Sequence, residues 1–281
     1  MMKSICIKTN NTENIDYLLN LINSINQNDI CYSNNTFKHY KNIIIHYAGH
    51  DLEAFISNIS EILSCLVIDL YEENILKRLI ISNYFYFDNQ ERDIVFDICL
   101  ELLAENNLES FDDRYKLLFD SFNIYLFENN KLVLDGFINF RTKKYISFLE
   151  SVIDNAVNQF IIEREYWEFI SLLKVYINSE ISSADCVHLI YSSEHSVLLD
   201  KNKNIIDMET DIFKARYLSD ITFSSNDYAL NTLLNLLPKK IFIHLSDNKI
   251  DEFINTLLLI FENRVEICEI CQRNRRLSMG T

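Results

Sequence analysis

The chain has 281 residues, 48% hydrophobic and 24% charged, values typical of a globular protein that exclude a largely disordered or low-complexity chain. Its 41 acidic and 26 basic residues give a formal net charge of −15, which repels phosphate backbones and anionic lipids, so we expect neither a nucleic-acid nor a membrane partner. With only 3 glycines and 1 proline, a fold built from many tight turns is disfavoured.

The first fifty residues predict a strand, a helix and a second strand. Residues 3–9 alternate between polar and apolar, residues 12–26 place apolar side chains at helical spacing, and residues 40–47 return to a strand pattern. The apolar run at the N-terminus is too short for an export signal, so we expect a cytoplasmic protein.

A cluster of polar residues follows the second strand. His46, His50, Asp51 and Glu53 could together bind a metal ion. The alternative, which we favour, is that Gly49 turns the chain and Asp51 caps the next helix.

The middle of the chain predicts helices. One apolar stripe begins after Asp51, a second helix follows Asp88, and a third covers residues 113–127. Beyond Asp135-Gly136 the chain runs to about Asn178 without Gly or Pro, which fits one long helix or two helices with a bend. No stretch of about 18 uncharged apolar residues occurs, so we expect no membrane span.

The apolar period changes near residue 180. We expect strands at residues 186–191, 195–199, 240–245 and 264–268, and helices from Asn226 to Pro238 and from Ile250 to Phe261. The clearest basic patch is the C-terminal tail, with Arg264, Arg273, Arg275 and Arg276.

These patterns predict an α+β fold with three regions. They are a β-α-β segment at 1–50, a helical region at 51–180, and a mixed α/β region at 181–281. The fold class is a central helical region flanked by α/β ends with a mixed sheet, and the two ends could share one sheet around a helical insert.

The chemistry-bearing motifs of common enzymes are absent from the sequence. It has no P-loop, no G-x-G-x-x-G, no G-x-S-x-G elbow and no H-E-x-x-H. We therefore name no catalytic residue, and an enzymatic activity is disfavoured. The odd number of cysteines, 7, favours reduced thiols over disulfides.

The most specific local motif is the pair Cys268 and Cys271. Two thiolates at this spacing could chelate Zn²⁺, with His244, His188, Cys186 or a second chain completing the coordination, or could form a redox pair. The simpler reading is two ordinary thiols near a solvated tail, so we expect no cofactor unless zinc is bound here.

A second candidate site consists of Arg141, Lys143 and Lys144. Positive charge near the start of a helix opposes the helix dipole, and this cost is offset if the three side chains bind an anion or an acidic surface. The alternative is neutralisation by acidic residues of a neighbouring turn or helix, namely Glu163, Glu165 or Glu168.

Three stretches together resemble the YtxC-like family of sporulation proteins from endospore-forming bacteria. They are the aromatic run at 84–87 before an acidic helix, GFINFRTKKY (136–145) with REYWEFISLLKVY (164–176), and KIFIHL (240–245) with RVEICEIC (264–271). The resemblance implies a cytoplasmic protein linked to sporulation and brings no activity or catalytic residue. The family's ending often reads Cys-x-Gly-Cys with a further Cys, whereas Ile270 replaces the Gly here and no further Cys follows.

Taken together, the sequence predicts a non-enzymatic interaction or assembly factor whose protein partner is unknown. Two alternatives stay open: an anion- or small-ligand-binding regulator using Arg141, Lys143 and Lys144, and a metalloprotein or enzyme organised around Cys268 and Cys271.

Overall fold

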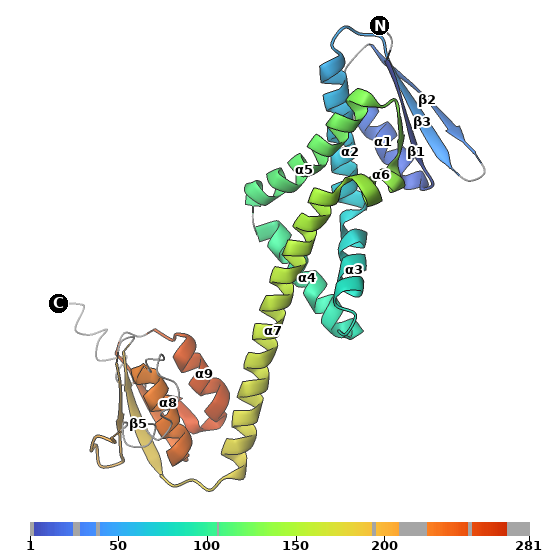
Figure 1. Ribbon diagram of the computed structural model, residues 1–281. Coiled ribbons are helices and arrows are strands. Elements are labelled where there is room, and N and C mark those ends of the chain that lie inside the picture. The colour runs from blue at the N-terminus through green and yellow to red at the C-terminus, as the bar shows by residue number, and fades with distance from the viewer. Residues whose placement is uncertain are drawn as a thin grey trace, which may run out of the picture. The chain divides into compact units, whose positions relative to one another are not determined.

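The computed structural model describes residues 3–24, 29–37, 40–105, 107–192, 195–207, 224–246 and 249–268. The chain divides into two compact units, 1–162 and 163–281, and the boundary falls within the long helix α7 (Lys143–Ser179) (Figure 1). Each unit contains a mixed sheet and helices, which confirms the α+β fold class. The possibility that the two ends share one sheet is wrong, because the described strands form two separate sheets.

The sheet of unit 1 has the strand order β2-β3-β1-β4. Its strands are β1 (Lys3–Thr9), β2 (Ile30–Thr36), β3 (Lys41–Tyr47) and β4 (Lys131–Val133). Strand β3 pairs antiparallel with both β1 and β2, while β4 pairs parallel with β1. The sequence did not predict β2, because this edge strand is exposed from Cys31 to Thr36 and carries no alternation of apolar residues.

The helices of unit 1 are α1 (Thr12–Ser24), α2 (Leu52–Leu70), α3 (Glu72–Asn83), α4 (Asn89–Glu105), α5 (Asn107–Glu128) and α6 (Leu134–Arg141). Helices α1, α2 and α4 begin where expected, whereas α5 begins six residues before the expected position 113 and the break between α2 and α3 at Tyr71 was not predicted. Helix α1 contacts β1 and β3, and α2 packs along α1 and α5. The Asp51 side chain accepts a hydrogen bond of 2.9 Å from the amide of Ala54, so Asp51 caps α2 as expected.

The run from Asp135 to Asn178 is two helices, α6 and α7, separated at Thr142. The hydroxyl of the buried Thr142 donates a hydrogen bond of 2.7 Å to the carbonyl of Ile138. The Thr142 carbonyl in turn accepts from the amide of Ile146 at 3.0 Å. Because both helix ends are bonded through one buried residue, the junction between α6 and α7 is fixed.

The sheet of unit 2 has the strand order β6-β5-β7-β8. Its elements are β5 (Cys186–Tyr191), β6 (Ser196–Leu199), α8 (Ser225–Leu236), β7 (Lys240–Leu245), α9 (Glu252–Phe261), the 3₁₀ turn η2 (Glu262–Arg264) and β8 (Val265–Ile267). Strand β7 pairs parallel with β5 and β8, and β6 pairs antiparallel with β5. Helix α8 is capped by Ser224 rather than by Asn226, since Ser224 and Asp227 form a reciprocal capping box.

Each unit has its own apolar core. In unit 1 the buried Ile5, Ile43 and Ile45 of the sheet face helix residues such as Phe55 and Leu63. In unit 2 one face of the sheet packs on α8, α9 and the second half of α7; its buried apolar residues include Val187, Leu189, Ile241, Ile243, Leu233, Leu257, Ile170 and Ile177.

None of the described helices alone combines the length and apolar character needed to cross a bilayer. Only α2 and α3 taken together, with a bend of 54° between them, have a sufficient length and apolar composition among the described residues.

Candidate functional site

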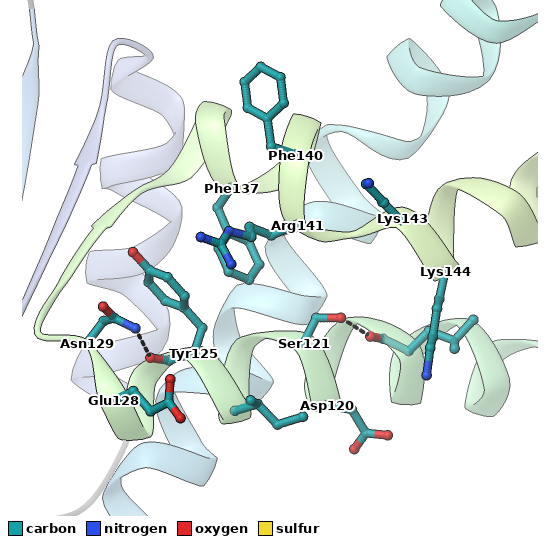
Figure 2. Close-up of a pocket in the computed structure, with 12 residues that line it drawn as sticks. Asp120, Ser121, Tyr125, Glu128, Asn129, Phe137, Phe140, Arg141, Lys143 and Lys144 are labelled. Carbon is teal, nitrogen blue, oxygen red and sulfur yellow. Dashed lines mark hydrogen bonds between the residues drawn. The ribbon is translucent and has the colours of Figure 1, made fainter.

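A cavity of about 820 Å³ in unit 1 lies between α5 and the junction of α6 with α7 (Figure 2). The lining residues of α5 recur every three or four positions, so they form one face of that helix. They are Leu117, Asp120, Ser121, Ile124, Tyr125 and Glu128, with Asn129 just beyond the helix. The opposite side is lined by Phe137, Phe140, Arg141, Lys143 and Lys144.

The three cations expected to bind an anion therefore line one cavity. Their positions on the helices differ from the sequence interpretation, which placed all three near a helix start. Arg141 is the last residue of α6, where the helix dipole favours positive charge, whereas Lys143 and Lys144 open α7, where it opposes positive charge. No acidic residue lies in the first turn of α7 to offset that opposition.

Within the described part of unit 1, these cations are not neutralised by an ion pair. None of the three has a carboxylate oxygen within 4.0 Å among the described residues. The acidic residues expected as neutralising partners belong to the other unit, where Glu168 lies 3.7 Å from Arg164 on its own helix. The positive charge is thus available to a ligand that enters the cavity.

Aromatic rings set the direction of Arg141. Its guanidinium lies over the Tyr125 ring, 5.9 Å from the ring centroid, within the range of a cation–π contact. Tyr125 meets Phe137 edge-on at 5.0 Å between ring centroids, and Phe137 stacks on the buried Phe122 at 4.5 Å. The Tyr125 hydroxyl donates to the carbonyl of Lys131 at 3.1 Å, which holds the ring from its other end.

His188 and His244, two of the candidate metal ligands, lie on the face of the unit 2 sheet opposite its core. Nδ1 of His188 and Nε2 of His244 are 3.0 Å apart, so the two imidazoles share a hydrogen bond. The amide of Cys268 donates to the carbonyl of Ile243 at 2.8 Å, which continues the β7–β8 ladder and brings Cys268 beside His244 in register. Burial, followed by the charge of His188, lowers the pKa of His244.

This arrangement brings together part of the expected zinc site. Cys271 lies outside the described residues, and among the residues that are described no three His, Cys, Asp or Glu side chains are grouped to hold a metal ion. A structural zinc site needs four ligands, so zinc binding stays a prediction. Metal analysis of protein purified without chelator, before and after Cys268→Ser, tests it.

The sequence did not reveal a buried charged cluster in the helices of unit 1. Arg114 donates to one carboxylate oxygen of Glu72 at 2.6 Å, and the Tyr145 hydroxyl donates to the other at 2.8 Å. Burial raises the pKa of Glu72, and Arg114 and Tyr145 oppose that rise. Because none of the three lines the cavity, they hold α3, α5 and α7 together rather than contact a ligand. Glu72 lies in a polar stretch, so no pattern in the sequence marked it as buried.

The comparisons with known proteins identify the family. The model of the YtxC-like family matches residues 57–266, three quarters of the chain, so the chain belongs to the YtxC-like family. The uncharacterised protein YtxC of Bacillus subtilis (strain 168) is 20% identical over 202 residues, which cover 70% of this chain and 71% of that relative. No solved structure matches the chain. The matched residues include both the cavity and the histidine pair.

Proposed function

We propose that this protein is a non-enzymatic interaction or assembly factor that acts in the cytoplasm during sporulation. The observation that carries the proposal is a row of exposed apolar side chains on the second half of α7. Phe169, Leu172 and Tyr176 are 50%, 69% and 43% exposed. Their spacing of three and four residues puts them on one side of the helix; we call them the α7 apolar row.

The α7 apolar row is not explained by the core of unit 2. The core is packed by Ile170, Leu173 and Ile177, which lie on a different side of the same helix. A helix with apolar residues on two sides is typically covered by other protein on both sides. An apolar surface that is left exposed marks an interaction site. The partner that fits best is an apolar helix face of another protein, because a partner helix can pack into residues at this spacing.

The biological setting of the proposal rests on two further supports. The sporulation link is what the resemblance of the sequence to the YtxC-like family of sporulation proteins implies. The cytoplasmic location is supported by the thiols of Cys6, Cys31, Cys65, Cys99 and Cys186, which are not in disulfides. Thiol labelling of denatured, unreduced protein from its own cells should find all 7 cysteines reactive; missing thiols would argue against the location.

A pull-down from sporulating cells tests the interaction. The full chain, tagged, is compared with the triple variant Phe169→Ser/Leu172→Ser/Tyr176→Ser. A matched control, Ile81→Ser/Phe85→Ser/Ile94→Ser, removes three exposed apolar side chains from unit 1 instead. We expect a partner retained by wild type and control and lost from the α7 variant. Equal recovery with all three chains would contradict the proposal.

A second candidate function is an anion-binding regulator. It is favoured by one specific observation: Arg141, Lys143 and Lys144 line a single cavity without an ion pair among the described residues of unit 1. Calorimetric titration with inorganic phosphate at low salt tests it. Binding that disappears in Arg141→Met/Lys144→Met would support this function, and the failure of wild type to bind phosphate or any larger anion would count against it.

A further inference from the structure

We propose that the cavity between α5 and the α6–α7 junction binds an aromatic organic anion, that is, a flat ring carrying a single carboxylate or phosphate ester. The inference rests on the anion-binding function proposed above and adds the ligand's chemical class. Three properties of the cavity lead to it: where the cations point, what surrounds them, and how much charge they leave uncompensated.

The cations supply the anion-binding end. Figure 2 shows Arg141 extending toward the Tyr125 ring and Lys144 extending toward α5, whereas Lys143 and Phe140 point away from α5. A guanidinium offers two parallel donors that match a carboxylate or phosphate, and an ammonium adds a point charge. Because Arg141 rests on the Tyr125 ring, little side-chain freedom is lost when it binds the anion.

Apolar surface next to Arg141 supplies the ring-binding end. Tyr125 and Phe137 lie at 5.0 Å between ring centroids, and neighbouring groups hold both in place. Ile124, one residue before Tyr125 on α5, is 66% exposed and lines the same cavity. Because Phe137 is only 4% exposed, a flat apolar ligand group would cover Ile124 and the accessible part of the Tyr125 ring, and removing that surface from water favours binding. A bare inorganic anion would leave it exposed.

The charge and size of the cavity limit the ligand further. Asp120 and Glu128 line the α5 side of the same cavity without forming an ion pair with the three cations, so the ionisable side chains of the lining carry a formal net charge of about one positive unit. This balance suits a ligand with one anionic group and disfavours a polyanion such as a nucleic acid. The volume of about 820 Å³ falls within the range of small-molecule sites.

The test compares whole probes with their parts on the full-length protein, by calorimetry or ligand-observed NMR. The whole probes are 2-naphthoate and 1-naphthyl phosphate; the parts are acetate, inorganic phosphate and 2-naphthol. We expect at least one whole probe to bind about tenfold or more tightly than every part, because only a whole probe uses both ends of the cavity. The two whole probes distinguish a carboxylate ligand from a phosphate ester.

Variants locate the binding. Arg141→Met/Lys144→Met should weaken the naphthyl probe about tenfold or more, since two charge-assisted contacts are removed. Ile124→Asp should weaken it as well and, at an exposed position, should leave the fold intact. The control Lys77→Met/Lys116→Met removes the same charge from exposed lysines outside the cavity and should change affinity less than about twofold.

The outcomes separate this inference from the function on which it rests. If phosphate binds as tightly as naphthyl phosphate and both depend on Arg141 and Lys144, the anion-binding function stands and the aromatic ligand is wrong. If no anionic probe binds, both are wrong. The inference is overturned if the naphthyl anions bind no more tightly than 2-naphthol, or if they bind Arg141→Met/Lys144→Met as tightly as wild type. Either result would show that the naphthyl ring adsorbs to apolar surface elsewhere.

Discussion

Gly49 shows how one residue without a side chain positions a helix. It needs no positive φ angle; its requirement is space. A Cβ atom at Gly49 would overlap the hydroxyl and Cζ of the buried Tyr47. That ring stacks on Phe55 at 4.6 Å, and its hydroxyl accepts from the amide of Asp51 at 3.1 Å, so it cannot move aside without loss.

We therefore expect Gly49→Ala to lower the free energy of unfolding by about 1–3 kcal/mol, the usual cost of overpacking. The matched control is Gly136→Ala in α6, where the nearest atom to the new Cβ is Val133 Cγ1 at 3.8 Å. It should be neutral or stabilising by up to about 1 kcal/mol, because alanine favours helix more than glycine does. Urea unfolding followed by far-UV circular dichroism measures both. Equal changes in the free energy of unfolding for the two variants would show that the Tyr47 ring can move aside without loss.

The lowered pKa of His244 predicts the sign of a pH dependence in unit 2. Its pKa is lowered in the folded state, so the unfolded chain takes up a proton first as the pH falls. The stabilising contribution is present above about pH 6.5 and is lost below it. The unfolding of unit 2 can be followed by fluorescence of the single tryptophan, Trp167. We expect the urea concentration at the midpoint of this transition to be lower at about pH 5.5 than at about pH 7.5. His244→Asn should flatten this dependence, and His50→Asn in unit 1 should not.

At the scale of elements, helix starts followed local rules closely. Asp51 bonds the amide of Ala54, and Asp88 accepts from the amide of Glu91 at 2.9 Å, as the sequence suggested for both. Such caps depend on residues three positions apart, so a sequence reveals them. Strands β2 and β4 were missed because one is exposed and the other has only 3 residues.

The cap of α2 is open to a direct test. Asp51→Ala should lower the free energy of unfolding by about 1 kcal/mol, because the amide of Ala54 loses its partner. Asp51→Asn keeps an oxygen acceptor at the same place and should cost clearly less. The measurement is urea unfolding of wild type and both variants at neutral pH. If Asp51→Asn lowers the free energy of unfolding as much as Asp51→Ala does, the charge of Asp51 matters and its hydrogen bond to the helix does not.

At the scale of the whole molecule, the buried apolar side chains of the described residues form two separate cores. One runs from Ile5 to Phe160 and the other from Ile170 to Phe261. Leu233→Ala, in the core of unit 2, should lower the stability reported by Trp167 by about 2–5 kcal/mol. Leu63→Ala, in the core of unit 1, should change that signal by less than about 0.5 kcal/mol. Equal shifts in the Trp167 transition would show that the two units unfold as one.

Net charge also acts on the whole molecule. At −15, the protein should show no binding to random duplex DNA at about micromolar concentration and physiological salt, measured by fluorescence anisotropy. Arg264 of the basic tail is engaged within unit 2, donating to the carbonyl of Ile177 at 3.1 Å. Micromolar affinity would contradict the prediction, and Arg273, Arg275 and Arg276, which lie outside the described residues, would then be mutated first.

The sequence by itself determined the fold class and most helices and strands, and it indicated Arg141, Lys143 and Lys144 as a candidate anion-binding group. Periodicity, caps and runs of charge act over a few positions, so a single chain displays them. The tertiary structure alone decided that the strands form two sheets, that Glu72 is buried against Arg114, and that α5 supplies Asp120, Tyr125 and Glu128 to those cations. Each of these three features brings together residues that are far apart in the chain. Such contacts depend on how whole helices and strands pack, and a local sequence pattern does not encode that packing.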